Sequence, residues 1–291
     1  DAGNGTTGIF APQLMRAIGC EVIELYCDLD GNFPNHEANP EEERNMLDLA
    51  AAVRENKADF GIGFDGDGDR VGIVDENGKH YSADYLLMLL AREMLAQTPK
   101  GQVVFDVKVS KVVIDEITRL GGIPVMSKTG HSFIETKIHE LNAPLGGEIS
   151  GHMFFGKVFY NYYGFDDAMY TAARVLEILS RSSDPSAVLD ALPTSFSTPE
   201  LNVPCAEGEH HAVIEKLRET ATFDGAELTT IDGLRADYPG GFGLVRASNT
   251  TPVLVLRFEG HTPEALERIQ KHFMSQILAV KPDAHVGASA H

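Results

Sequence analysis

Asp65-Gly66-Asp67-Gly68-Asp69-Arg70 is the stretch that decides how this chain of 291 residues is interpreted. Three carboxylates stand at every second position with glycine between them, and an arginine ends the run. Carboxylates this close repel one another unless a cation lies among them, and a hard divalent cation prefers oxygen ligands. The glycines let the backbone fold tightly enough for Asp65, Asp67 and Asp69 to converge on one ion. The run therefore predicts a Mg²⁺ site.

Short apolar runs lie on both sides of this acidic loop, which we define as residues 65–70. Residues 58–64 and 71–74 both predict strands, so the loop is expected to join two strands. An EF-hand loop also begins with alternating acids, but Arg70 stands where that loop needs glycine, and helices would have to flank it. A solvated acidic turn without an ion, or a phosphatase-like aspartate nucleophile at Asp65, would also give an acidic run of this kind.

Composition limits the classes of function. Hydrophobic residues make up 43% and charged residues 23% of the chain, which are globular values. The length of 291 residues predicts two to three domains. The formal charge of -19 argues against nucleic acid or an anionic membrane as a partner. No apolar run approaches the roughly 18 residues of a membrane helix. The 3 cysteines have no metal-binding spacing, which favours a reducing, cytoplasmic location.

The chain opens with a glycine-rich turn at residues 1–8, a pattern that normally follows a strand and leads into a helix. Residues 9–18 predict this helix, and residues 20–26 predict the next strand. The glycines of the turn also match the spacing of a dinucleotide-binding turn. However, no strand precedes them, and only Glu24 offers an acid near the second strand. We therefore expect a fragment cut at a domain boundary rather than a dinucleotide-binding protein.

Helical and strand patterns alternate from residue 85 onward, which predicts parallel sheets. Residues 180–204 are rich in Ser, Pro and Asp and resemble a linker. Beyond them, strands neighbour strands and two helices flank them, which indicates an α+β domain. The expected class is α/β: two consecutive α/β domains with mixed or parallel sheets at residues 1–80 and 81–195, then a smaller α+β domain at residues 196–291. The predicted helices are residues 85–95, 111–120, 167–179, 210–221 and 263–280, and the predicted strands are residues 102–107, 123–126, 227–232 and 252–258.

Two further loops carry groups that suit a polyol and a phosphate. Glu148, Ser150 and His152 gather a carboxylate, a hydroxyl and an imidazole among glycines, and the first two can share hydrogen bonds with vicinal hydroxyls. Residues 246–251 place an arginine, three hydroxyls and an amide in close succession, a set that can surround a phosphate. An ordinary polar turn is the alternative for each loop.

Three segments together resemble the α-D-phosphohexomutase superfamily, and they follow one another in the order found there. They are the acidic loop, the Gly-Glu-Ile-Ser-Gly-His segment at residues 147–152 and the Arg-Ala-Ser-Asn-Thr segment at residues 246–250. The resemblance is closest to its bacterial phosphomannomutase/phosphoglucomutase branch, and it covers nearly the whole chain. In that family the first of four domains carries a phosphorylated serine within a Thr-Ala-Ser-His-Asn-Pro type loop, and this sequence has no such segment. The resemblance therefore implies domains two to four without the phosphoserine domain.

The resemblance implies a role for each loop. Asp65, Asp67 and Asp69 would hold Mg²⁺ together with a phosphoserine oxygen from the missing N-terminal domain. Glu148 and Ser150 would bind the hydroxyls of the sugar in either of its two orientations. Arg70 would lie beside that phosphoserine, Lys108 and His131 would line the cleft, and His152 would help to move protons. The remaining positions that match the family would bind the phosphate that is not transferred: Arg246, Ser248, Asn249 and Thr250.

The implied reaction is reversible transfer of a phosphoryl group between O1 and O6 of a hexose phosphate, through a phosphoserine and a hexose 1,6-bisphosphate. Ile149 resembles the apolar residue of the mannose/glucose branch more than the glutamine of the phosphoglucosamine branch. A phosphoglucosamine mutase and an inactive module that binds Mg²⁺ and sugar phosphate are the alternatives. The isolated chain is expected to be inactive, because its sequence contains no phosphoserine segment.

Overall fold

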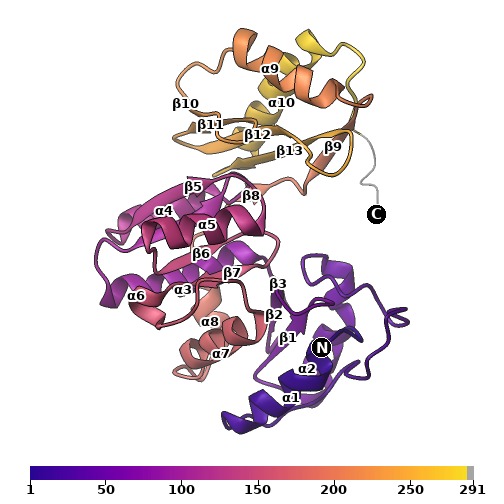
Figure 1. The fold of residues 1–291 in the computed structure, drawn as a ribbon, viewed down its shortest axis with the longest axis vertical. Coiled ribbons are helices and arrows are strands. Elements are labelled where there is room, and N and C mark those ends of the chain that lie inside the picture. The colour runs from indigo at the N-terminus through magenta and orange to yellow at the C-terminus, as the bar shows by residue number, and fades with distance from the viewer. Residues whose placement is uncertain (287–291) are drawn as a thin grey trace. The chain divides into compact units, whose positions relative to one another are not determined.

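The computed structural model describes residues 1–286 and divides into two compact units (Figure 1). The first unit is formed mainly by residues 1–193, and the second mainly by residues from 194 onward. The first unit contains two sheets and the second contains one. Helices accompany each sheet, so the expected α/β class is confirmed. The boundaries predicted near residues 80 and 195 stay a prediction.

The first sheet carries the acidic loop. Its strands β1 (Phe60–Phe64), β2 (Val71–Asp75) and β3 (His80–Tyr81) are antiparallel and lie in the order β1-β2-β3. Phe64 pairs with Val71, so residues 65–70 close a hairpin between two strands, as predicted. Strands rather than helices flank the loop, which contradicts the EF-hand alternative. The helices of this part are α1 (Thr7–Ala17), a 3-10 helix (Glu43–Met46) and α2 (Leu47–Asn56).

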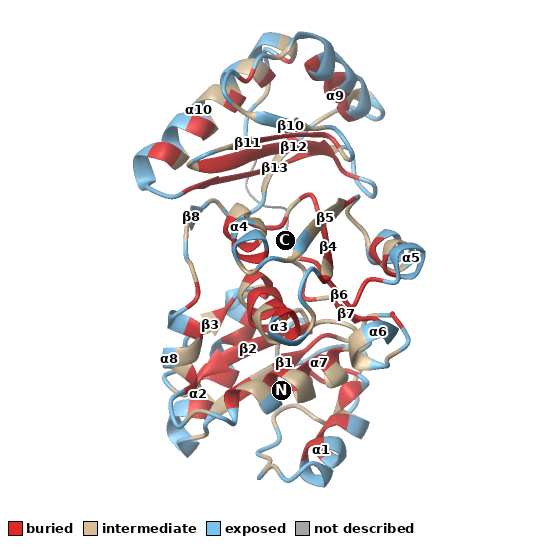
Figure 2. Cartoon of the chain, turned by 90° about the vertical axis from the view of Figure 1, so that its left-hand side faces the viewer, coloured by how far each residue is buried: buried red, intermediate tan, exposed pale blue. Residues whose placement is uncertain are grey.

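The second sheet has the strand order β5-β4-β6-β7. β4 and β6 are parallel, as the alternation of helix and strand predicted, and β7 is antiparallel to β6. α3 is buried along most of its length because apolar residues cover nearly its whole circumference (Figure 2). The strands are β4 (Gln102–Asp106), β5 (Ile123–Ser127), β6 (Leu145–Gly147) and β7 (Met153–Phe155), and the helices are α3 (Ala83–Gln97), α4 (Lys111–Arg119), α5 (His131–Leu141), α6 (Lys157–Tyr160), α7 (Ala168–Leu179) and α8 (Pro185–Asp190).

A buried carboxylate on α4 stabilises this part of the first unit. The side chain of Glu116 is 2% exposed and accepts hydrogen bonds from Arg92 Nε at 2.6 Å and from Arg119 Nε at 2.7 Å. The hydrogen bond from Arg119 is the main reason why the pKa of Glu116 is lowered from 4.5 to about 2, and Arg92 adds to it.

Helix α7 packs against β2 of the first sheet and against the helices α1 and α3. Asp167 caps its first turn, and Oδ1 of this residue accepts the backbone N–H of Tyr170 at 2.9 Å. The helix N-terminus thereby has a fixed position next to the acidic loop, since the backbone N–H of Ala168 donates to the carbonyl of Gly68 at 3.2 Å.

The second unit is an antiparallel sheet covered on one face by two helices (Figure 2). Its strand order is β10-β11-β12-β13-β8, and β9 also pairs with β13. The apolar core lies between the sheet and the helices, around Leu217, Phe258 and Phe273. The elements are β8 (Phe196–Ser197), β9 (Leu201–Pro204), α9 (Glu209–Thr220), β10 (Glu227–Thr229), β11 (Leu234–Tyr238), β12 (Gly241–Ala247), β13 (Val253–Gly260) and α10 (Pro263–Val280).

Two predictions about local structure were wrong. Residues 20–26 form no strand. The carbonyls of Leu25 and Tyr26 accept backbone N–H groups from the opening turn, and the carbonyl of Val22 accepts Nη2 of Arg16 at 3.5 Å. Residues 180–204 are not a plain linker, because they contain α8, β8 and β9. The Ser, Asp and Pro residues mark a helix start there: Asp184 accepts the N–H of Ala187 at 2.9 Å, and Pro185 takes the first helical position. None of the helices in residues 1–286 is long and apolar enough to cross a membrane.

Candidate active site

Asp65 organises the acidic loop from inside. Its side chain is 2% exposed, and the backbone N–H groups of Gly68, Asp69 and Arg70 donate to Oδ1 at 3.0 to 3.1 Å. Arg70 Nε donates to Oδ2 at 2.8 Å. Burial raises the pKa of Asp65 to about 6, although the hydrogen bonds from Arg70 oppose this effect. Because both oxygens accept hydrogen bonds from the loop itself, Asp65 is poorly placed to act as a nucleophile.

Neighbouring segments hold the loop in place. The backbone N–H of Thr6, in the opening turn, donates to the carbonyl of Gly66 at 2.9 Å. Gly68 has a φ of +88°, and a Cβ atom there would lie 2.6 Å from Cγ2 of Thr7. Glycine is therefore required at this position both by its backbone conformation and by the close approach of the opening turn. The turn and the N-terminus of α7 together fix the loop.

The three aspartates of the loop can serve one metal ion. Each of Asp65, Asp67 and Asp69 offers an oxygen within 4.8 Å of the others. Asp67 is exposed and has no hydrogen bond or ion pair among residues 1–286. Oδ1 of Asp69 is buried and accepts no hydrogen bond from that part of the chain. A buried acceptor without a donor is unfavourable, so an ion that coordinates this oxygen would compensate for it. The donor set, which consists of oxygens alone, fits a hard divalent cation.

Residues 148–152 form a tight turn between β6 and β7. The backbone N–H of Glu148 donates to the carbonyl of His152 at 2.9 Å, and Gly151 has a φ of +104°. The Glu148 side chain accepts the N–H of Gly130 at 2.7 Å through Oε1 and the hydroxyl of Ser150 at 3.2 Å through Oε2. The structure therefore brings the predicted pair Glu148 and Ser150 together, and a sugar hydroxyl would have to share these hydrogen bonds.

The charge state of Glu148 follows from its neighbours. Burial alone would raise the pKa of Glu148, but hydrogen bonds from His152 and from the N–H of Gly130 lower it further than burial raises it. The positive charge of Lys108, which follows β4, also lowers this pKa. Lys108, Gly130 and Glu148 come after the carboxyl ends of β4, β5 and β6, which is the usual location of sites in sheets with parallel strands.

His152 joins this turn to the acidic loop. Its Nε2 lies 3.3 Å from Oδ2 of Asp69, and Nδ1 lies 2.8 Å from Oγ of Ser150. The backbones also meet, because Arg70 and His152 form an isolated bridge and the N–H of Val71 donates to the carbonyl of Gly151 at 3.3 Å. Burial lowers the pKa of His152, but Asp69 and Glu148 outweigh burial and raise it to about 9. Without a metal ion, His152 therefore carries a proton on each ring nitrogen at neutral pH.

The pKa of Asp69 shifts in the opposite direction to that of His152, because the same contact between them favours the charged form of each. The hydrogen bond with His152 lowers the pKa of Asp69 to about 2, against the effect of burial. Asp69 thus remains ionised over the physiological range. The contact between these residues links the predicted metal-binding loop to the predicted sugar-binding turn.

Asp166 was not predicted from the sequence. Its Oδ2 lies 3.5 Å from Nδ1 of His131 and 3.9 Å from Nε2 of His152. The rings of the two histidines are 5.6 Å apart, so the structure brings the predicted pair His131 and His152 together. The sequence did offer a signal, because two consecutive aspartates precede α7 and a helix needs only one N-cap residue. Asp167 is that cap, so the carboxylate of Asp166 is available for another role.

The predicted phosphate-binding residues lie in the second unit, around the end of β12. Arg246 is 5% exposed, and its Nε donates to Oδ2 of Asp232 at 3.0 Å. Its Nη2 is buried and has no hydrogen-bond partner among residues 1–286. Oγ of Ser248 accepts the backbone N–H of Thr250 at 3.3 Å, while Asn249 and Thr250 themselves are exposed. The sequence analysis did not identify Asp232, whose contact depends on the fold.

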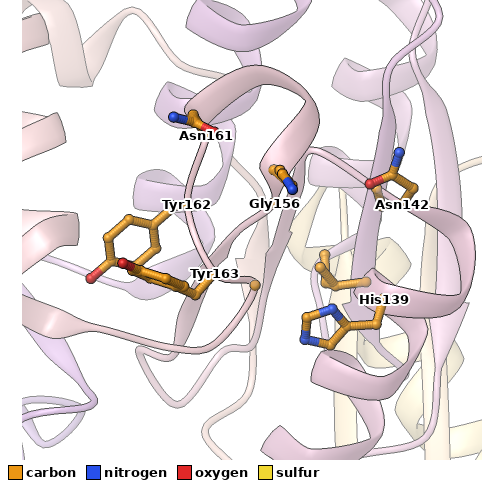
Figure 3. Close-up of a pocket in the computed structure, with 10 residues that line it drawn as sticks. His139, Asn142, Gly156, Asn161, Tyr162 and Tyr163 are labelled. Atoms are coloured by element: carbon orange, nitrogen blue, oxygen red, sulfur yellow. The ribbon is translucent and has the colours of Figure 1, made fainter.

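A pocket elsewhere in the first unit is not the predicted site. It has a volume of about 390 Å³ and lies between the end of α5 and the segment after β7, where His139 and Asn142 lie opposite Tyr162 and Tyr163 (Figure 3). None of the predicted site residues lines it. The candidate site is instead the junction of the acidic loop and the 148–152 turn.

The chain has close relatives among known proteins. It is 51% identical over 281 residues to phosphomannomutase/phosphoglucomutase of Pseudomonas aeruginosa, a match that covers 96% of this chain and 60% of the relative. It is 50% identical over 279 residues to phosphoglucomutase of Neisseria gonorrhoeae, with 95% and 60% covered. The chain thus spans about 60% of the length of these curated relatives.

Structural comparison gives the same family. A crystal structure of a phosphoglucomutase/phosphomannomutase family protein from Burkholderia thailandensis has a TM-score of 0.92 and 49% identity, over 98% of this chain and 61% of that one. Family models for phosphoglucomutase/phosphomannomutase match in succession: α/β/α domain II at residues 1–78, α/β/α domain III at residues 82–196 and the C-terminal domain at residues 200–276. The chain therefore belongs to the phosphoglucomutase/phosphomannomutase family, as its three loops indicated.

Proposed function

We propose that this chain supplies the metal-, sugar- and phosphate-binding parts of a hexose-phosphate mutase. The reaction would move a phosphoryl group reversibly between O1 and O6 of mannose or glucose phosphates, through a phosphoserine and a hexose 1,6-bisphosphate. The observation that carries the proposal is the 3.3 Å contact between Asp69 and His152, because it joins the loop that we predict to bind a cation to the turn that we predict to bind the sugar. The names of the relatives support mannose and glucose as the sugars.

The oxygen ligands favour Mg²⁺ as the metal. Asp65, Asp67 and Asp69 would hold it, and Mg²⁺ supplies neutralisation of the negative charge on a transferring phosphoryl group. Arg70 adds a positive charge beside the same loop and is held there by Asp65. Catalysis of phosphoryl transfer depends mostly on positioning and charge neutralisation, which these groups provide.

The other residues would bind and orient the sugar phosphate. Glu148 and Ser150 would hydrogen bond to sugar hydroxyls, and His152, protonated at neutral pH, would donate a hydrogen bond or a proton from Nε2. Lys108 and His131 would line the same site. Arg246, Ser248, Asn249 and Thr250 would hold the phosphate that is not transferred, with Nη2 of Arg246 as an available donor.

We further propose domain boundaries near residues 80 and 195 and no mutase turnover by the 291 residues alone. The second point rests on the absence of a Thr-Ala-Ser-His-Asn-Pro type segment from the sequence. On this proposal the chain alone binds Mg²⁺ and sugar phosphate without converting it.

A coupled assay of glucose 1-phosphate and mannose 1-phosphate conversion tests these proposals. Two proteins are compared, with Mg²⁺ and a hexose 1,6-bisphosphate present: the chain alone, and the chain joined to a first domain from a relative of the family. Activity in the joined protein and none in the chain alone is expected. Turnover by the chain alone would disprove the role of an external phosphoserine. A joined protein that converts only glucosamine phosphates would disprove the proposed substrates.

A further inference from the structure

We propose that Asp69, His131, His152 and Asp166 form a second metal site, selective for Zn²⁺, which we call the histidine–aspartate cluster. These residues offer two imidazoles and two carboxylates, and each provides a ligand atom within 4.8 Å of the others. Zn²⁺ accepts such mixed nitrogen and oxygen ligands, whereas Mg²⁺ strongly prefers oxygen. The cluster therefore differs in chemistry from the triad of aspartates in the acidic loop.

Three of the six separations within the cluster are close to those of tetrahedral coordination, and the others are within 4.8 Å. Ligand atoms placed tetrahedrally about 2.0–2.1 Å from Zn²⁺ are about 3.3–3.4 Å from one another. Nε2 of His152 lies 3.3 Å from Oδ2 of Asp69 and 3.9 Å from Oδ2 of Asp166, and Nδ1 of His131 lies 3.5 Å from the same Asp166 oxygen. Side-chain shifts of a few tenths of an ångström would bring the longest of these separations into the tetrahedral range.

The surroundings of His152 orient it as metal ligands are usually oriented. Its Nδ1 lies 2.8 Å from Oγ of Ser150 and 3.3 Å from Oε2 of Glu148, which leaves Nε2 facing the cluster. A histidine whose other ring nitrogen is bound to a carboxylate or hydroxyl is the common arrangement around zinc, because that bond fixes the ring and strengthens its basicity.

Asp166 is also fixed and lacks a donor. It forms an isolated bridge with Phe154 of β7 and directly precedes Asp167, the cap of α7. Its Oδ2 is buried and accepts no hydrogen bond among the described residues 1–286. A metal ion in the cluster would coordinate this oxygen and so compensate for the missing hydrogen bond. The side chain of His131, which is 60% exposed, would supply a further ligand atom to the same ion.

Asp69 belongs to both metal sites, and this sharing has a consequence. Oδ2 of Asp69 faces His152, whereas Oδ1 lies 3.9 Å from Nε of Arg70 in the acidic loop. Two divalent cations that share one carboxylate repel each other, and each receives less of its charge. Zn²⁺ in the histidine–aspartate cluster should therefore weaken Mg²⁺ binding and should occupy His152. The inference goes beyond the mutase proposal, because it concerns metal binding and does not depend on turnover.

Co²⁺, a spectroscopic substitute for Zn²⁺, tests the site in the 291-residue chain. Tetrahedral Co²⁺ gives intense visible absorption, whereas octahedral Co²⁺ absorbs weakly. We expect tetrahedral bands that Zn²⁺ abolishes and that His131→Ala weakens with at least a tenfold loss of affinity, since even indirect supporting residues change metal affinity by roughly 10–100-fold. His131→Ala should leave the Mg²⁺ affinity measured by calorimetry unchanged. Because His131 is exposed, the variant should stay folded, which circular dichroism checks.

Asp67→Asn is the matched control, because Asp67 belongs only to the triad. It should weaken Mg²⁺ binding and leave the tetrahedral Co²⁺ bands unchanged. Added Zn²⁺ should raise the apparent dissociation constant for Mg²⁺ in the wild type but not in the His131→Ala variant. Octahedral Co²⁺ spectra, or a Co²⁺ affinity that falls with Asp67→Asn and not with His131→Ala, would overturn the inference. Either result would place transition metals in the acidic loop instead.

Discussion

Replacing Asp67 with asparagine should change the stability of this protein in opposite directions with and without Mg²⁺. Asp67 is exposed and has no hydrogen bond or ion pair among the described residues, so its removal breaks no contact of the metal-free fold. It does remove one of three neighbouring negative charges. The metal-free variant should therefore be slightly more stable than the wild type, although Mg²⁺ should stabilise it less.

The size of each effect can be estimated. Two unit charges 4.8 Å apart, the upper limit for the separation of ligand atoms in the triad, repel by about 0.9 kcal/mol in water. Because Arg70 offsets part of this repulsion, a gain of about 0.5–1 kcal/mol is expected without metal. Mg²⁺ at one hundred times its dissociation constant stabilises a fold by about 2.7 kcal/mol. A tenfold weaker affinity at the same concentration reduces this to about 1.4 kcal/mol.

Urea unfolding followed by far-ultraviolet circular dichroism measures the stability with and without Mg²⁺. Tryptophan fluorescence is no option, because the sequence contains no tryptophan. Asp59→Asn is the control, because Asp59 is an exposed carboxylate just before β1 and outside the triad. The control should respond to Mg²⁺ as the wild type does. Equal stabilisation of the wild type and the Asp67→Asn variant by Mg²⁺ would refute the role of Asp67. Absence of any stabilisation in the wild type would refute the site as a whole.

Three further predictions concern charged side chains in other parts of the chain. In the joined protein, Arg246→Ala should weaken binding of mannose and glucose phosphates alike by more than tenfold, from the loss of a charge-assisted contact of about 1.5–3 kcal/mol. Calorimetry would measure the dissociation constants of both sugar phosphates. The Asp232→Asn variant keeps the arginine and removes the negative charge of its partner, so it distinguishes the effect of losing Arg246 from the effect of losing the ion pair. Glu148→Gln should weaken sugar-phosphate binding by a larger factor than Mg²⁺ binding, which Glu148 affects only through His152 and Asp69. Equal losses of both would contradict a role in sugar recognition. Glu116→Gln should lower stability at neutral pH by about 2 kcal/mol. Since the pKa of Glu116 is lowered from 4.5 to about 2, its contribution is complete above pH 4.5 and disappears toward pH 2, so the two unfolding curves should converge there. Glu140→Gln, at an exposed ion pair, should have little effect at any pH.

Features that depend on local signals could be predicted from the sequence. Helix α10 has the predicted bounds, because Thr262 accepts the N–H of Ala265 and Pro263 occupies the first helical position. The acidic loop lies between two strands as expected, since apolar runs flank it on both sides. Glu148, Ser150 and His152 also contact one another as their spacing suggested, because a five-residue turn between strands keeps them close.

Other features depend on contacts between distant residues and had no local signal. Asp166 is 35 and 14 residues from His131 and His152 in the sequence, and the backbone bridge between Asp166 and Phe154 of β7 helps to bring it to them. Asp232, just before β11, meets Arg246 of the neighbouring strand β12. Residues 20–26 failed as a strand because an extended apolar pattern forms a strand only where a partner supplies a continuous ladder, and the opening turn supplies isolated hydrogen bonds instead.

The relation between the acidic loop and the 148–152 turn is fixed by direct hydrogen bonds rather than by the packing of two separate domains. The N–H of Val71 donates to the carbonyl of Gly151, the N–H of Ala168 donates to the carbonyl of Gly68, and Asp69 faces His152. These contacts join residues from the two predicted domains at residues 1–80 and 81–195. A displacement of the 148–152 turn would therefore also move the ligand Asp69. The acidic loop and the turn are thus expected to act as one structural element, in which metal affinity and sugar affinity are coupled through a single aspartate–histidine contact.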